Sequence, residues 1–251
     1  MSAMSGGRVA LAAALGLAVA SMLVYALRGG QTDADARRKG ATFFLGAGDF
    51  LLHWFMWLLF PLEQLAVRLQ LRPDFFNYAG LALGALSGAF IAFGRLEPGG
   101  IAILLGGVCD ILDGRLARRL KVDSSYGKFI DSTLDRFVEV FALLGFVFFL
   151  RAFPSGPLVA SAALSGSLLV SYARARGEVV GVLCREGLMQ RGERIVLLCF
   201  GCFFDRPFSA HLGRPEGFLS LWVLGVIAAA SLGTAAYRTA WIARRLREER
   251  R

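Results

Sequence analysis

Long apolar segments dominate the chain and alternate with short polar ones. Uncharged runs cover residues 9–27, 75–94, 152–173 and 217–237, and shorter apolar runs cover 99–109, 137–150 (apart from Glu139) and 195–204. Each of the four uncharged runs has roughly the 20 residues that an α-helix needs to cross a bilayer. Backbone polar groups in lipid must be bonded within the segment. The pattern therefore predicts an all-α, polytopic integral membrane protein.

Six helices are expected in the main part of the chain, over about 75–94, 99–120, 127–150, 156–176, 191–205 and 217–242. Within the first of them Gly80, Gly84 and Gly88 recur every four residues. Small residues at this spacing let a neighbouring helix approach closely, so this stripe indicates helix packing.

Two further segments precede this six-helix core. Residues 1–40 are interpreted as an extra hydrophobic helix and a polar linker, because the run over 9–27 exceeds the apolar core of about 7–15 residues in a signal peptide. Residues 41–72 begin with an aromatic-rich stretch and continue as PLEQLAVRLQLRPD. The helical spacing of its apolar residues predicts an amphipathic juxtamembrane helix at the interface, with a second extra span as the alternative.

Composition and charge sharpen this picture. The chain is 56% hydrophobic, against about 45–50% in soluble domains. Its net charge of +9 could suggest nucleic acid, but the basic residues gather in 28–72, 115–128, 174–194 and 238–251. Alternating loops put these clusters on one side, which the positive-inside rule makes cytoplasmic. We therefore expect a protein of the cytoplasmic membrane with no nucleic-acid partner. The four cysteines indicate no disulfide framework.

The stretch DILDGRLARRLKVDSSYGKFIDSTLD, residues 110–135, interrupts the apolar pattern with charge. On a helix, Asp110, Asp113, Gly114 and Ala117 share one face, because they are spaced i, i+3, i+4 and i+7. On the next helix Gly127, Asp131 and Asp135 share a face at i, i+4 and i+8. The short polar link between them predicts an antiparallel hairpin, in which four carboxylates converge near the cytoplasmic end of the membrane.

Four neighbouring carboxylates repel one another, and each costs on the order of 2.5–3.5 kcal/mol at the bilayer centre. Divalent cations would relieve both penalties, and oxygen ligands favour Mg²⁺ or Mn²⁺ over zinc. Two ions held by four carboxylates form a clamp suited to displacement at phosphorus. The alternative is a set of helix-end salt bridges to Arg115, Arg118, Arg119 and Arg136. That alternative fits two aspartates better than four on two matched faces.

The spacing D-x-x-D-G-x-x-A-R-x8-G-x-x-x-D-x-x-x-D resembles the signature of the CDP-alcohol phosphotransferases, also called CDP-alcohol phosphatidyltransferases. The resemblance implies a six-helix catalytic domain over 73–251, a homodimer, and a reaction in which an acceptor hydroxyl attacks CDP-diacylglycerol or a related CDP-lipid and releases CMP. It further implies that Asp110, Asp113 and Asp131 hold the metal and through it the pyrophosphate. Asp135 would complete the metal site and act as general base.

The same resemblance implies residues for the nucleotide. Gly114 and Gly127 would let it approach the backbone, and Arg118 would pair with its phosphates beside Ala117. Upstream, PDFFNYAG resembles the family's nucleotide-side segment and adds Asp74 and Asn77 to the CDP-binding set.

Two arginine-bearing segments, SYARARGE and GLMQRGERIVLL, follow at the cytoplasmic ends of later helices. Guanidinium groups suit a phosphate, although arginines that only set the topology would look the same. Both segments resemble the branch that attaches inositol phosphate, which implies an acceptor such as inositol 1-phosphate. The acceptor-phosphate candidates are Ser171, Arg174, Arg176, Arg191 and Arg194.

Other functions remain open from the sequence. The same chemistry could use glycerol 3-phosphate, serine or an amino alcohol. An intramembrane prenyltransferase also uses aspartate-bound magnesium pyrophosphate, but it needs neither the small residues nor Arg118. A divalent-cation transporter or an inactive binding scaffold would retain the carboxylates without releasing CMP.

Overall fold

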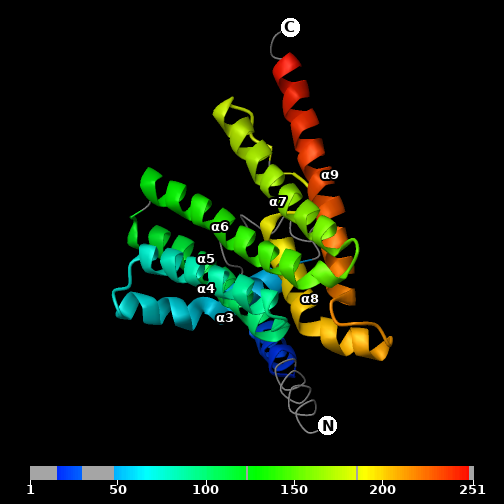
Figure 1. Ribbon diagram of the computed structural model, residues 1–251. Helices are drawn as coiled ribbons and strands as arrows, with labels where there is room; N and C mark the ends of the chain where they lie inside the picture. Colours follow the sequence, from blue (N-terminus) through cyan, green and yellow to red (C-terminus); the bar gives the residue numbers. More distant parts are fainter. Residues whose placement is uncertain (1–15, 30–47, 123, 185, 249–251) are drawn as a thin grey trace. The chain divides into compact units, whose positions relative to one another are not determined.

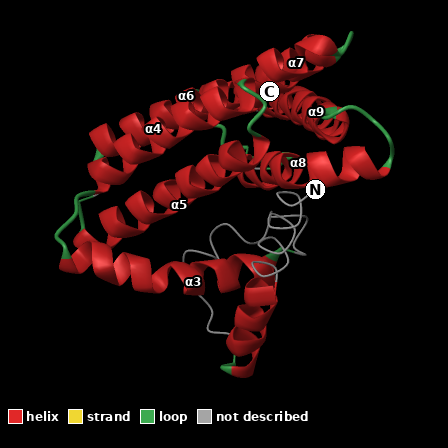
Figure 2. Ribbon diagram, turned by 60° about the horizontal axis from the view of Figure 1, so that its bottom comes forward, coloured by secondary structure: helices red, strands yellow, loops and turns green. Residues whose placement is uncertain are grey.

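The computed structural model describes residues 16–29, 48–122, 124–184 and 186–248. Every regular element in those ranges is helical (Figure 2), which confirms the all-α prediction. The chain divides into two compact units, Met1–Leu65 and Ala66–Arg251.

The first unit contains the helical segment Gly16–Leu27 and most of α3 (Asp49–Arg68). The start of the predicted N-terminal helix and the polar linker lie outside the described residues. Tyr25 packs its ring against Phe50 and Trp57, with centroids 5.6 and 5.7 Å apart. Trp54 donates a hydrogen bond to the Ser21 hydroxyl at 3.1 Å. Aromatic side chains therefore join the two helices that the structure describes in this unit.

A single helix, α3, joins part of the aromatic-rich stretch to the amphipathic one, with Pro61 inside it. The stretch PLEQLAVRLQLRPD, which predicts the amphipathic helix, starts at this proline. Its length and composition also qualify α3 as a candidate membrane span, in keeping with the alternative of a second extra span. The interfacial position of residues 41–72 stays a prediction.

The second unit contains the six expected helices in chain order (Figure 1). The 3₁₀ turn η2 (Leu150–Ala152) connects α6 to α7. The α8 helix extends beyond its expected end, with Pro207 inside the helix. The α9 helix continues into the basic tail. The bounds are α4 (Pro73–Ala92), α5 (Leu96–Leu120), α6 (Ser125–Phe149), α7 (Gly156–Val179), α8 (Arg191–His211) and α9 (Phe218–Glu248).

Four of the described helices are long and apolar enough to cross a membrane: α3, α4, α7 and α9. The other three long helices, α5, α6 and α8, carry the charged residues that the sequence singled out. Those charges lower their mean hydropathy.

The glycine stripe of α4 is a packing surface, as predicted. A Cβ atom on Gly84 would lie 2.8 Å from the Val138 Cα atom, and one on Gly88 would lie 2.3 Å from the Phe141 carbonyl oxygen. Both neighbours belong to α6. Gly80 faces α5 instead, with Cys109 at an ordinary contact distance of 3.6 Å. Glycines, which lack a side chain, therefore allow α4 and α6 to pack closely against each other.

The hairpin of α5 and α6 differs from the expectation. Both helices pack extensively against α4, but they make few contacts with each other. Lys121 ends α5 in the left-handed conformation, with φ 55°, and Ser124 caps α6 by accepting a hydrogen bond from the Gly127 amide at 3.0 Å. The two helices are consecutive in the chain, and each packs mainly against α4. The aspartates therefore lie on two helices that meet near the link and pack mainly against α4.

Candidate active site

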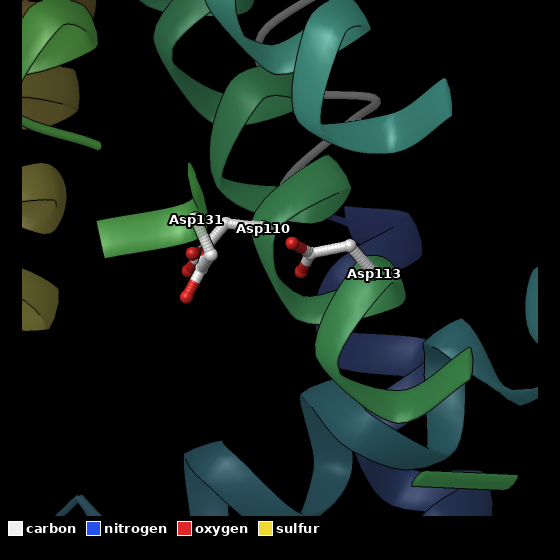
Figure 3. Close-up of side chains that lie close together, drawn as sticks. All are labelled: Asp110, Asp113 and Asp131. Atoms are coloured by element: carbon white, nitrogen blue, oxygen red, sulfur yellow. The ribbon is translucent and has the colours of Figure 1, made fainter. Parts of the chain in front are cut away.

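Three of the predicted aspartates converge where α5 and α6 meet. Asp110 and Asp113 lie one turn apart on α5, and Asp131 lies in the second turn of α6; Figure 3 shows their side chains gathered in one place. One oxygen of each carboxylate lies within 4.8 Å of the others. Asp113 is buried and accepts a hydrogen bond from the Gly114 amide at 2.5 Å, which fixes its orientation.

The chemistry of this triad fits a divalent cation. Three carboxylates supply hard, anionic oxygen donors, which suit magnesium or manganese. Their mutual repulsion at this spacing is relieved by a positive charge placed between them. Asp110, Asp113 and Asp131 can therefore hold a metal ion, as the sequence predicted.

The fourth aspartate reaches the same site through an arginine. Arg191 opens α8, and its Nη1 atom lies 2.7 Å from Asp110 Oδ1 and 2.5 Å from Asp135 Oδ2. One guanidinium nitrogen thus bridges a member of the aspartate triad and Asp135. The side chains of all three residues are only 18–25% exposed. Partial burial strengthens this contact relative to an ion pair in open solvent.

A pocket opens at this bridge between four helices. Asn77 of α4, Asp110 of α5, Asp135 of α6 and Arg191 of α8 all line it, with apolar and glycine residues between them. Asn77, a predicted nucleotide-binding residue, therefore shares a cavity with the aspartates. Asp74 lies on the exposed first turn of the same helix.

The small residues of the motif shape the surroundings of the triad. A Cβ atom on Gly114 would lie 3.2 Å from Arg118 Nη1, so the missing side chain lets Arg118 fold back along α5. Arg118 itself is exposed, and its neighbour Ala117 is half-buried. The Gly127 amide is engaged by the cap of α6. Contact of these four residues with a nucleotide stays a prediction.

Of the predicted acceptor-phosphate residues, the structure brings Arg191 to the aspartates. Arg174 is exposed and pairs with Glu178 on its own helix, with Nε and Oε1 2.9 Å apart. Arg176 is also exposed on α7, and Ser171 is half-buried.

Arg194 lies one turn after Arg191 and is buried. Its Nε and Nη2 atoms contact the two carboxylate oxygens of Glu139 at 2.5 and 3.2 Å, and Nη1 donates to the Met189 carbonyl at 3.3 Å. Glu139 is not among the predicted site residues. Its spacing offered a signal, because it continues the face of Asp131 and Asp135 at a further i+4.

Arg238 of α9 is a second residue that sequence reasoning missed, having assigned it to the basic tail. It is 3% exposed and donates to the Glu186 carbonyl at 2.9 Å and to the Val170 carbonyl at 3.1 Å. It also interacts electrostatically with Arg174 and Arg194. Arg238 thus ties the segment before α8 to α7 and α9.

Comparisons with known proteins show which family the chain resembles. Residues 70–182 match the sequence pattern of the CDP-alcohol phosphatidyltransferase family. The chain is 34% identical over 140 residues to the archaetidylinositol phosphate synthase of Methanothermobacter thermautotrophicus, covering 56% of this chain and 70% of that protein. It is 31% identical over 184 residues to the phosphatidylinositol phosphate synthase of Mycolicibacterium smegmatis, covering 68% and 79%.

Crystal structures of the phosphatidylinositol phosphate synthase of Mycobacterium tuberculosis share the fold. The form with bound CDP-DAG has a TM-score of 0.62 at 23% identity, over 72% of this chain and 92% of that one. The complex with manganese and citrate has a TM-score of 0.64 at 24% identity, over 72% and 87%. With its several long apolar helices, the chain is an integral membrane protein.

Proposed function

The chain belongs to the CDP-alcohol phosphatidyltransferase family, and on that premise we propose that it makes a phospholipid from CDP-diacylglycerol and a phosphorylated polyol such as inositol 1-phosphate. One observation carries the proposal. The candidate general base Asp135 and a candidate acceptor-phosphate arginine, Arg191, line one pocket with the metal-site aspartate Asp110.

The donor is assigned to the α4, α5 and α6 side of this pocket. Asp110, Asp113 and Asp131 would hold the metal, with Asp135 completing a site for two ions, magnesium or manganese. Bound divalent cations supply charge neutralisation at the pyrophosphate and at the departing phosphate. Asp74 and Asn77, with Gly114, Ala117, Arg118 and Gly127, would bind CDP. The manganese complex of the mycobacterial relative supports the metal assignment.

The proposed reaction is a single displacement. Asp135 accepts the proton of the acceptor hydroxyl, whose oxygen bonds to the phosphorus that carries the diacylglycerol. The bond from that phosphorus to the CMP oxygen breaks, and CMP leaves with the electron pair. Asp135 suits the role of base because it lies in the pocket and outside the close aspartate triad.

The acceptor is assigned to the α7 and α8 side. Arg191, Arg174 and Arg176 would meet its phosphate, with Ser171 beside them. Arg194 is held by Glu139, and this ion pair would fix the start of α8 beside the other arginines. The names of the relatives support a phosphorylated inositol as acceptor. Membership of the family excludes the two alternative functions of a prenyltransferase and a cation transporter.

We also propose that the pocket faces the cytoplasm and that the enzyme is a homodimer. The alternating basic clusters support the orientation, and the family resemblance supports the dimer. Labelling single cysteines placed at residues 174 and 214 in intact cells, together with cross-linking in native membranes, tests both.

The decisive experiment measures CMP release by purified protein supplied with CDP-diacylglycerol and Mg²⁺ or Mn²⁺. Inositol 1-phosphate, glycerol 3-phosphate, serine or no acceptor is added in parallel. We expect release that depends on inositol 1-phosphate and is lost in Asp135→Asn. Release supported only by serine would overturn the anionic acceptor, and release retained by Asp135→Asn would overturn the assignment of the base.

A further inference from the structure

Two ion pairs join α6 to α8 as neighbouring rungs of a ladder. Asp135 and Glu139 are spaced i, i+4 on α6, and their partners Arg191 and Arg194 are spaced i, i+3 on α8. Each spacing places its two residues on one helix face. We call Glu139–Arg194 the inner rung and Asp135–Arg191 the outer rung.

The two rungs differ in burial and in the way they are bonded. In the inner rung, Arg194 is 2% and Glu139 9% exposed, and two guanidinium nitrogens meet two carboxylate oxygens. In the outer rung, one nitrogen of Arg191 is shared between Asp135 and Asp110, and the side chain is a quarter exposed. The inner rung is a fixed two-point attachment, whereas the outer rung is a single-nitrogen contact beside the pocket.

The outer rung engages a carboxylate that belongs to the proposed metal site. Asp110 Oδ1, which accepts from Arg191, belongs to a carboxylate of the metal-site triad. A divalent cation and a guanidinium compete for the same carboxylate charge, and they repel each other at contact distance. Arg191 can leave without moving α8, because the inner rung holds the helix and the long arginine stem is flexible.

We propose that Arg191 is an internal counter-cation of the metal site, which bridges Asp110 and Asp135 when metal is absent and is displaced when metal binds. The displaced guanidinium then becomes available to the anionic acceptor, so metal and acceptor phosphate bind cooperatively. The first statement stands on the geometry alone, and the second rests on the proposed function. Glu139 and Arg194 act as positioning residues that keep Arg191 at the rim of the site.

The first test measures Mn²⁺ affinity of the full-length protein in detergent by electron paramagnetic resonance, with no lipid or acceptor present. Arg191→Gln is expected to bind Mn²⁺ about tenfold more tightly, within the usual range of coupling between sites. The same variant is expected to unfold a few degrees lower in EDTA, because the carboxylates lose their counter-cation, and to regain stability with Mn²⁺.

Two matched controls separate displacement from a general charge effect. Arg136→Gln removes a charge next to Asp135, but that guanidinium bonds the Ser132 carbonyl. Arg206→Gln removes a charge from the same helix, where Arg206 pairs with Glu216 at 3.0 Å. We expect a small shift for the first control and none for the second. Equal tightening by Arg136→Gln and Arg191→Gln, or unchanged Mn²⁺ affinity in Arg191→Gln, would overturn the counter-cation.

Two measurements keep the proposal testable if Arg191→Gln fails to fold. Arg191→Lys keeps the charge but is more strongly hydrated, so an intermediate Mn²⁺ affinity is expected. In the wild type, saturating inositol 1-phosphate should tighten Mn²⁺ binding, with Mn²⁺ tightening inositol 1-phosphate by the same factor. This coupling should vanish in Arg191→Gln. Acceptor-dependent CMP release without the coupling would overturn the cooperative part while leaving the proposed function intact.

Discussion

Aspartates lie at both ends of α8, but their surroundings differ. Near its end, Asp205 is fully buried and accepts hydrogen bonds from the Gly217 and Ser220 amides, both at 2.6 Å, and from the Ser209 hydroxyl at 3.3 Å. At its start, Arg191 meets Asp110 and Asp135 beside a pocket. Neutral donors of the protein enclose Asp205, whereas the aspartates of the site gather negative charge in one place.

This difference distinguishes a carboxylate that stabilises the fold from carboxylates that we propose to serve chemistry. Asp205 joins α8 to the first turn of α9, because its negative charge is stabilised by hydrogen bonds from backbone amides of the protein. The three carboxylates of the triad lie close enough together to hold an external cation. The same residue type in the same apolar surroundings therefore has two roles, and the neighbouring donors decide which one applies.

Asp113→Asn is expected to show the largest effect on activity. Asp113 is buried at 4% exposure within the triad. Its loss weakens the binding of a cation that would stabilise the transition state by several kcal/mol. We expect CMP release to fall on the order of a thousandfold. Thermal stability in EDTA should hold or rise, since one repelling charge is removed. A large loss of stability in EDTA would contradict the functional role of this carboxylate.

Asp205→Asn makes the same chemical change at the other end of α8. One oxygen that accepts from a backbone amide becomes a donor, so we expect a loss of about 1.5–3 kcal/mol in stability. Thermal unfolding should show a lower midpoint, whereas CMP release per folded molecule and Mn²⁺ affinity should stay unchanged. Weaker Mn²⁺ binding in this variant would break the distinction between the two regions.

Gly88→Ala tests the packing that holds α6 against α4. Its new methyl group would lie 2.3 Å from the Phe141 carbonyl oxygen, and overpacking of this kind costs about 1–3 kcal/mol. Gly225→Ala is the matched control, because a Cβ there meets nothing within 4 Å. We expect a lower unfolding midpoint for the first variant only. Equal midpoints would contradict the close approach of the two helices.

Arg174→Gln is expected to have the smallest effect on stability. Its ion pair with Glu178 is nearly half exposed on both sides, and such pairs contribute about 0–1 kcal/mol. The KM for inositol 1-phosphate should rise while the KM for CDP-diacylglycerol stays the same. An unchanged KM for the acceptor would indicate that Arg174 only sets the membrane topology and does not bind the acceptor.

Local information in the sequence determined the helices and the faces of the aspartates. The apolar runs predicted all six helices of the second unit, because hydrophobicity and internal backbone bonding are properties of a single segment. The i, i+3 and i, i+4 spacings predicted which aspartates share a face. The stripe of Gly84 and Gly88 predicted a close helix contact, although not that the partner is α6.

Only the tertiary structure decided which side chains meet across helices. It placed α4 against both α5 and α6, so that these two diverge instead of packing as a hairpin. It paired Arg191 with Asp110 and Asp135, Arg194 with Glu139, and Asp205 with the start of α9. The partners in these contacts are separated by 15 to 81 positions in the chain. Helical periodicity fixes the direction of a side chain within its own helix, but its partner depends on how helices far apart in sequence pack together.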